Sequence, residues 1–245
     1  MKRLIGFLIL GIFVQAWSQT PSALEILKKV DENLTSERKI IQSKMIVHGR
    51  RGSRTIVAKS YIEGTERSFT EYLSPPRERG TKMLKLGDNL WTYSPAADRI
   101  IRISGHMLRQ SVMGSDLSYE DMMEDPVLHR IYEPIVEKED TVANRKCWVL
   151  LLKAKKRDVA YATRRLWVDQ ERFIPLKEEL YAKSGKLLKT VEIKEVMKVQ
   201  GQWQAKRIVF KDVLKSGKGT EFILEKIELN AKIPDYIFSK AALRK

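Results

Sequence analysis

The sequence predicts a mainly β protein with a few helices (α+β), built around one large, curled antiparallel sheet. Three observations lead to this prediction. Short stretches of alternating polar and apolar residues recur from Ile40 onward, a pattern typical of strands with one buried face. Turn residues separate these stretches at short intervals. One N-terminal segment and one central segment break the alternation and have helical features.

Residues 1–18 have the organisation of a secretory signal peptide. A basic start precedes an uncharged apolar stretch, and Ala16 and Ser18 are the small residues expected before a cleavage site. The apolar stretch is shorter than the roughly 20 residues that span a bilayer. We therefore expect cleavage near Ser18 and a periplasmic location in a bacterium with two membranes. No linker rich in Pro, Gly or Ser divides residues 19–245, and we expect them to form a single domain.

The chain is strongly basic, with a formal net charge of +15. Such a charge often indicates nucleic-acid binding, but a secretory signal makes nucleic acid a poor partner. Outside the cytoplasm, transient contact with an anionic membrane surface or an acidic partner is a better interpretation. A solvated basic face explains the charge equally well. Cys147 is the only cysteine, so we expect no internal disulfide and an ordinary apolar core.

An amphipathic helix is predicted over residues 22–34. Ser22 and Glu25 have the spacing of a capping box, which marks a helix N-terminus. Four apolar residues then fall on one face of the helix, namely Leu24, Leu27, Val30 and Leu34. This apolar face needs a partner surface.

The alternating stretches predict eleven to thirteen strands. Six precede the central break, starting near residue 40 and continuing at 54–63, 67–73, 82–86, 90–94 and 99–103. Seven follow it, at 132–141, 145–155, 160–169, 174–181, 187–199, 203–211 and 218–228. An antiparallel sheet of this size has to curl or close. The outer positions of the later strands are heavily charged, so one face lies in water and the other needs a cover.

The central break, from Gly105 to about Arg130, holds four of the eight methionines. We expect a loop with short helices near 107–113 and 119–124. This segment and the N-terminal helix are the two elements expected to cover the apolar face, and they are short for so large a sheet. Either side chains fill the interior, or an apolar groove remains for a ligand. Methionines suit a groove because they repack around variable shapes, although plain core packing explains them as well.

No catalytic or metal-binding pattern stands out. His48, His106 and His129 lie in separate segments without metal-ligand spacing. Ser115 precedes an aspartate, but the G-x-S-x-G elbow of hydrolases is missing. The glycines are isolated turn residues and form no phosphate-binding motif. We expect no catalytic residues, no metal and no cofactor.

Several segments resemble the periplasmic lipoprotein-sorting carriers. The segment Leu-Trp-Thr-Tyr-Ser-Pro at 90–95 is similar to their Leu-Trp-x-Tyr-x-Pro segment. Residues 72–81 and 111–121 resemble a broader branch of outer-membrane lipoprotein-sorting (LolA-like) proteins, and 166–169 and 175–177 fit the second half of the same pattern. The resemblance covers most of the chain after the signal peptide.

The resemblance implies an incomplete β-barrel (a half-barrel) whose concave apolar face is covered by an N-terminal helix and a central helical lid. It also implies that acyl chains of lipoproteins, or other envelope lipids such as phospholipid, occupy the cavity, in some relatives alongside an inner-membrane exporter. In the sorting carriers an arginine latches the lid to the sheet. Arg54 and Arg67 both lie in early strands, and the resemblance does not assign this role to either.

These observations lead to two hypotheses. The first is a carrier that shuttles acyl chains or lipids between membranes; the second is a non-enzymatic docking module for an envelope exporter or outer-membrane complex. For the carrier, the predicted cavity wall is Ile41, Met45, Val47, Leu84, Leu86, Trp91, Tyr93, Ile101 and Ile103. The predicted lid residues are Leu24, Leu27, Met107, Leu108, Val112 and Met113. Core packing is the competing explanation for every one of them.

Overall fold

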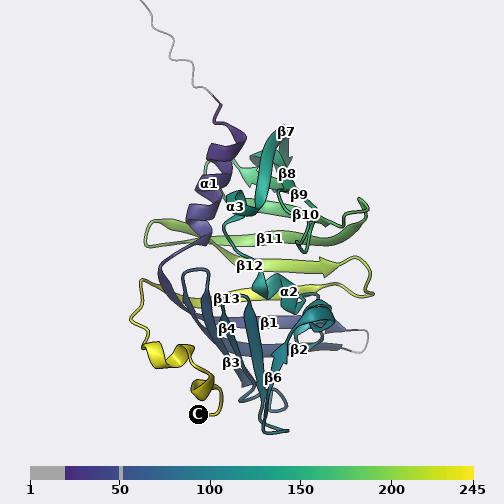
Figure 1. The fold of residues 1–245 in the computed structure, drawn as a ribbon. Helices are drawn as coiled ribbons and strands as arrows, with labels where there is room; N and C mark the ends of the chain where they lie inside the picture. Colours follow the sequence, from purple (N-terminus) through teal and green to yellow (C-terminus); the bar gives the residue numbers. More distant parts are fainter. Residues whose placement is uncertain (1–19, 50–51) are drawn as a thin grey trace, which may run out of the picture.

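The computed structural model describes residues 20–49 and 52–245; the predicted signal peptide lies outside these residues. The described chain forms a 13-stranded antiparallel sheet with helices over its concave face (Figure 1), which confirms the predicted fold class. The first six strands are β1 (Arg38–Gly49), β2 (Gly52–Glu63), β3 (Arg67–Ser74), β4 (Lys82–Leu86), β5 (Asn89–Ser94) and β6 (Arg99–Ile103). The other seven are β7 (Tyr132–Val142), β8 (Arg145–Ala154), β9 (Thr163–Asp169), β10 (Pro175–Tyr181), β11 (Leu187–Val199), β12 (Gln202–Asp212) and β13 (Thr220–Leu229).

The sheet consists of two meanders joined in the middle. From β1 to β6 the chain runs outward to one edge, and from β7 to β13 it runs inward from the other edge. The meanders meet where β13 pairs with β1, with Met45 opposite Phe222. This pairing joins residues far apart in the chain, which no local pattern predicts. Strands β6 and β7 remain as edges, so the barrel is not closed.

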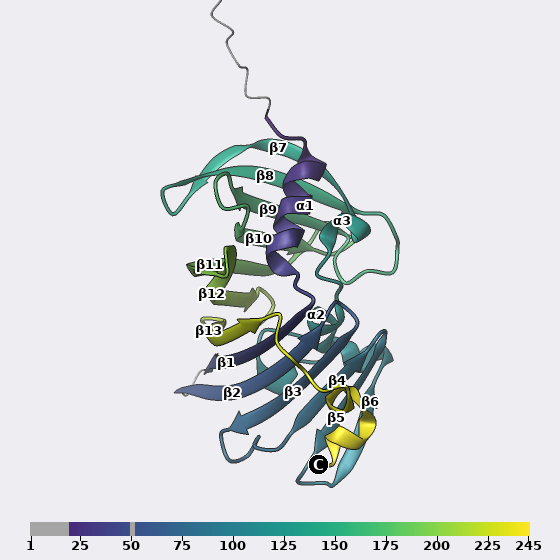
Figure 2. The same cartoon turned by 90° about the vertical axis from the view of Figure 1, so that its left-hand side faces the viewer.

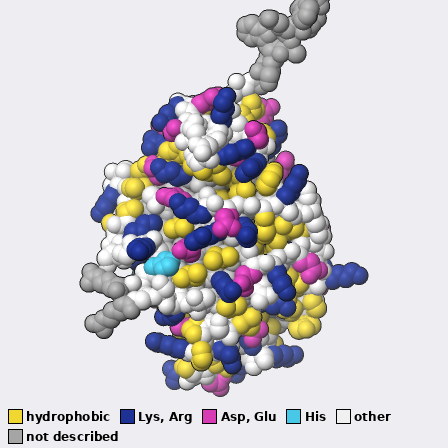
Figure 3. Space-filling model, turned by 180° about the vertical axis from the view of Figure 1, so that it is seen from behind, with side chains coloured by type: hydrophobic (Ala, Val, Ile, Leu, Met, Phe, Trp, Pro, Cys, Tyr) yellow, Lys and Arg dark blue, Asp and Glu magenta, His cyan; other side chains and the backbone are white. Residues whose placement is uncertain are grey.

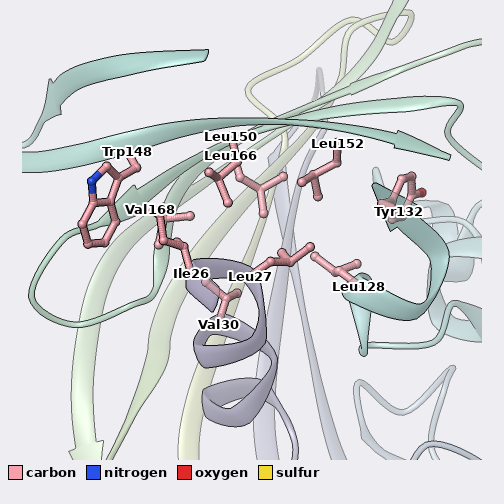
Figure 4. Close-up of a cluster of buried hydrophobic side chains, with 10 residues drawn as sticks. All are labelled: Ile26, Leu27, Val30, Leu128, Tyr132, Trp148, Leu150, Leu152, Leu166 and Val168. Atoms are coloured by element: carbon pink, nitrogen blue, oxygen red, sulfur yellow. The ribbon is translucent and has the colours of Figure 1, made fainter. Parts of the chain in front are cut away.

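The N-terminal helix α1 (Ala23–Leu34) covers one end of the concave face. Its capping box is present, since the Ser22 side chain accepts from the Glu25 backbone N–H and Glu25 bonds back to Ser22. The buried side of α1, including Leu27 and Val30, packs on β7, β8 and β9 (Figure 4). Leu24 is 42% exposed and Ile26 is fully buried in its place, so the buried stripe lies beside the predicted one.

The central insert (residues 104–131) covers the middle of the concave face. It contains the 3₁₀ turns η1 (Gly105–Arg109) and η2 (Val112–Gly114) and the short helices α2 (Tyr119–Met123) and α3 (Leu128–Ile131). The helix expected at 107–113 is replaced by the two 3₁₀ turns, because Gln110 and Ser111 between them have extended backbone, with ψ of 152° and 133°. The helix expected at 119–124 is confirmed as α2, and α3 was not predicted.

The C-terminal segment packs on the convex face. Two 3₁₀ turns, η3 (Asp235–Phe238) and η4 (Lys240–Leu243), lie against the outer side of β3, β4 and β5 (Figure 2). Phe238 and Leu243 are buried there. Both faces of this part of the sheet are therefore covered, which the sequence reading did not predict.

The rest of the outer face carries interleaved charges. Basic and acidic side chains are mixed across it rather than gathered by sign (Figure 3). Within residues 20–49 and 52–245, no helix has the length and apolar character needed to cross a bilayer.

Candidate ligand cavity

An apolar cavity of about 310 Å³ lies between the insert and the centre of the concave face. Its volume is at the lower end of the range for ligand sites, roughly 300–1,000 Å³. The apolar part of the sheet wall is Ile41, Met45, Ile56, Ala58, Ile62, Ile208, Phe210 and Phe222. The insert contributes Val112, Leu117 and Met122. The junction of β1 with β13 brings the two meanders into one wall.

Hydroxyl groups form the only polar part of the cavity lining, and none of the lining side chains carries a formal charge. Ser43, Ser60, Ser68 and Thr70 lie on β1, β2 and β3, and Ser60 and Thr70 bond to each other at 2.8 Å. The Tyr72 hydroxyl donates to the Met83 thioether at 3.3 Å, and burial raises the pKa of Tyr72. Because these groups stay neutral, the cavity suits an apolar occupant.

The insert is held to the sheet beside the cavity by Arg54 of β2. The Arg54 guanidinium donates to the carbonyl oxygen of Met113. Gly114 follows Met113 with φ of 69°, a left-handed conformation that favours glycine. One sheet arginine thus reaches the backbone of the 3₁₀ segment directly. Arg67 instead pairs with Glu63 of β2 and with Asp235 of the C-terminal segment.

A buried ionic network holds α2 to β9 and β11. Lys189 pairs with Asp121, and the Tyr161 hydroxyl donates to the same carboxylate. Burial alone would raise the pKa of Asp121, but the Lys189 ammonium and the hydrogen bonds outweigh it and the pKa is lowered. Arg164 pairs with Glu124 just beyond α2. Breaking such buried pairs is costly, so α2 is the firmly attached part of the insert.

Hydrogen bonds from uncharged donors hold the turn between η2 and α2. The Asp116 carboxylate accepts from the Thr220 hydroxyl at 2.7 Å and from the Asp212 backbone N–H at 2.9 Å. Ser115 is buried and its hydroxyl donates to the Leu117 carbonyl at 3.3 Å. Both side chains have structural partners, and neither contacts a histidine.

The whole fold matches solved structures with high coverage. A DUF1329 family protein from Desulfovibrio piger has a TM-score of 0.83 at 24% identity, covering 90% of this chain and 97% of that one. A putative outer membrane lipoprotein-sorting protein domain from Vibrio parahaemolyticus has a TM-score of 0.80 at 23% identity, covering 91% and 98%.

A LolA superfamily protein from Nitrosomonas europaea has a TM-score of 0.76 at 27% identity, covering 91% of this chain and all of the other. A family profile described as an uncharacterized protein matches residues 64–245, well over half of the chain. The chain belongs to the family of this profile, and its fold is LolA-like. A search of curated proteins found no match to the chain.

The predicted wall of this LolA-like protein is divided between the two faces of the sheet. Ile41 and Met45 line the cavity. Val47 and Ile103 belong to the neighbouring cluster beneath the insert, and Ile101 is 42% exposed.

The other four predicted wall residues lie on the convex face. They pack with the C-terminal segment and are Leu84, Leu86, Trp91 and Tyr93. The prediction that they share a wall with Ile41 is corrected here. The physical reason is that both faces of β4 and β5 are apolar, so alternation cannot indicate which face lines the cavity.

The predicted lid residues are divided as well. Val112 lines the cavity, and Met107, Leu108 and Met113 pack on the adjacent cluster of sheet residues. Leu27 is buried beneath α1 at the far end of the sheet, away from the cavity lining, and Leu24 is largely exposed. The lid over the cavity is therefore formed by the insert. Helix α1 fills the other end of the barrel.

Several residues that line the cavity were not predicted. Ile208, Phe210 and Phe222 come from β12 and β13, which are distant in sequence from the first meander. The alternation of polar and apolar residues in these strands is visible in the sequence. No feature of the neighbouring residues indicates that β13 pairs with β1. In the described part of the chain, no three His, Cys, Asp or Glu side chains are grouped as metal ligands.

Proposed function

We propose that the protein is a non-enzymatic periplasmic carrier that binds acyl chains of lipoproteins or other envelope lipids and shuttles them between membranes. The observation that carries the proposal is the uncharged cavity of about 310 Å³ beneath the insert. Each buried methylene contributes about 0.8 kcal/mol, so part of one acyl chain supplies substantial binding energy. Such binding needs no nucleophile, base or metal.

Release requires the cover to open at low cost. The insert offers a segment suited to this, since η1 and η2 are short 3₁₀ turns. Their polar contacts with the rest of the protein include the Arg54 bond to the Met113 carbonyl and the Lys215 bonds to Ser111 and Ser115. Among LolA-like proteins an arginine latch of the lid is expected, and we assign this role to Arg54. A ligand or partner membrane that binds the open state better shifts the population towards it.

The proposed periplasmic location rests on the signal peptide predicted for residues 1–18. It agrees with the names of two similar proteins, a putative outer membrane lipoprotein-sorting protein domain and a LolA superfamily protein. The proposed route of the cargo, with an inner-membrane exporter as a partner and transient contact with an anionic membrane surface, follows from the same family relationship and from the basic charge of the chain.

The first test is native mass spectrometry with lipid extraction, on protein purified from its own envelope. Bound phospholipid or acylated protein supports the carrier and names the cargo class. A clean apo mass, with no lipid taken up from vesicles, contradicts it and favours the second hypothesis, a docking module for an exporter or outer-membrane complex.

A cavity-filling variant makes the test specific. Ala58 lines the cavity, and Ala58→Phe should reduce lipid uptake because the new ring occupies the cavity, at a stability cost of about 1–3 kcal/mol. Thr55→Phe is the matched control, since Thr55 is exposed on the same strand and should leave uptake unchanged. Equal uptake by both variants would place the lipid elsewhere.

A further inference from the structure

A second, polar cavity of about 220 Å³ lies beside the apolar cavity and is here called the mouth. The two cavities share the lining residues Ile62, Ser68 and Met122, so they adjoin each other. The mouth is bounded by the end of α1 at Leu34 and Thr35, by the turn after β2, and by the segment that follows α2. It is the gap between the two covers of the concave face.

Two lysines line the mouth and lack acidic partners. Lys85 of β4 is only 8% exposed, and its ammonium donates to the carbonyl oxygens of Thr65 at 3.0 Å and Met123 at 3.2 Å. Lys39 of β1 donates to the Leu34 carbonyl at 3.1 Å. Within residues 20–49 and 52–245 neither ammonium forms an ion pair with a carboxylate. Buried charges in proteins are normally paired, so the buried Lys85 is unusual, and the half-buried Lys39 adds a second ammonium to the mouth.

The other charged residues of the mouth already have partners. Arg67 pairs with Glu63 and Asp235, and Glu124 pairs with Arg164. The two lysines therefore leave an excess of positive charge at the mouth. Burial lowers the pKa of Lys39 and, against weak attraction from Glu66, Asp125 and Asp88, also that of Lys85. Both shifts show that the local surroundings do not compensate the two ammonium charges.

A second basic depression on the same side of the molecule is different in this respect. It is lined by Lys189 and Lys215, but Lys189 pairs with Asp121 and Lys215 lies 3.7 Å from Asp212. Lys183 and Arg109 also line this depression, but both are exposed to solvent. Lysines that are buried or half-buried beside an apolar cavity without a carboxylate partner are a feature of the mouth.

We propose that the mouth binds the anionic head group of an amphiphile, a carboxylate or phosphate held by Lys39 and Lys85, while the apolar tail lies in the adjoining cavity. The inference rests on the proposed carrier function and narrows its cargo to acyl compounds with an anionic head. Charge-assisted hydrogen bonds from two ammonium groups are the strong kind, and the anion replaces the missing carboxylate partner. A neutral head group leaves the lysines uncompensated.

The test compares two probes of equal chain length, tetradecanoate and tetradecanol, by displacement of a neutral fluorescent dye at neutral pH. The wild-type protein should prefer tetradecanoate by about tenfold or more, as expected for a hydrogen bond to a charged group. Inorganic phosphate alone should displace no dye, because it lacks a tail. Displacement by phosphate at the same concentrations as tetradecanoate would contradict an amphiphile site.

Variants locate the preference. Lys85→Met and Lys39→Met should each reduce the ratio of the two affinities, with tetradecanol binding unchanged, whereas Lys85→Arg keeps the charge and should keep much of the preference. Lys146→Met is the matched control, because Lys146 is exposed on β8. The wild-type comparison needs no variant and so stands even if one fails to fold.

The outcomes separate this inference from the proposed function. Equal affinity for both probes, or a preference that survives both lysine substitutions, overturns the head-group site and leaves the carrier in place. Absence of binding by either probe overturns the carrier as well. A preference that is lost with Lys85 or Lys39 and retained in Lys146→Met supports the site.

Discussion

The two ends of one concave face are covered in different ways. Beneath α1 the sheet is a dry core in which Leu27, Leu150 and Leu166 are fully buried. Beneath the insert the same sheet leaves a cavity of about 310 Å³. The covers explain the difference. Helix α1 presents a continuous aliphatic face, whereas the insert consists of short turns and helices that combine apolar packing with polar contacts from Arg54 and Lys189.

One curled sheet therefore forms a packed core at one end and lines a ligand-sized cavity at the other. Apolar packing is lost when water enters, so the α1 end opens only with unfolding. Hydrogen bonds and ion pairs to a cover can exchange with water or with a ligand at a smaller net cost. The insert, which is attached partly through such polar contacts, is therefore the cover better suited to move.

The largest expected effect comes from truncating the packed end. Leu150→Ala should lower the free energy of unfolding by about 2–5 kcal/mol, since a new cavity forms among fully buried neighbours. Ile208→Ala, on the wall of the existing cavity, should fall at the low end of that range. Urea unfolding measures both, and equal losses would show that the two ends are packed alike.

A smaller effect is expected at the buried network. Asp121→Asn should cost about 1–3 kcal/mol at neutral pH, because the Lys189 ammonium loses its carboxylate. The folded-state pKa of Asp121 is lowered. Its contribution is therefore complete above the unfolded-state value, about 3.9, and is lost as pH falls through the lower folded-state value.

Acid unfolding checks this sign. Between neutral pH and about pH 3 the wild-type protein should lose more stability than Asp121→Asn, and the two curves should converge. Parallel curves would mean that Asp121 carries no linked stability. The variant also leaves the Arg54 contact intact, so hydrogen exchange near η2 should change less than exchange in α2.

The smallest effect on stability is expected at the latch. Arg54→Met should change the free energy of unfolding by about 1 kcal/mol or less, yet amide exchange around Met107 to Gly114 should accelerate because the contact to the Met113 carbonyl is lost. Arg67→Met is the control, since Arg67 binds the C-terminal segment instead. Similar exchange around η2 in both variants would contradict the latch.

Local patterns predicted much of this fold. The capping box at Ser22 and Glu25 and the period-two stretches depend on neighbours a few residues apart, so the sequence displays them directly. The face occupied by Trp91 and Tyr93 was predicted wrongly, because β5 has apolar residues on both sides. The apolar residues Ile233, Phe238 and Leu243 near the C-terminus were the signal that a second surface had to be covered.

The mouth shows the same limit at the level of single residues. Lys39 and Lys85 look like ordinary strand lysines in the sequence, and only the approach of α1 and the insert buries them without a carboxylate. The latch is similar, since Arg54 and Arg67 are alike in sequence, but Arg54 contacts the insert and Arg67 contacts the C-terminal segment.

The sequence by itself determined the strands, the N-terminal helix, the interruption in the middle and the scarcity of cover. Only the tertiary structure decided that β13 pairs with β1, that α1 fills one end while the insert leaves a cavity, and which side of β4 and β5 faces that cavity. The physical reason is range: hydrogen-bond periodicity and capping act within a few residues, whereas strand pairing and burial are settled by contacts between segments distant in the chain.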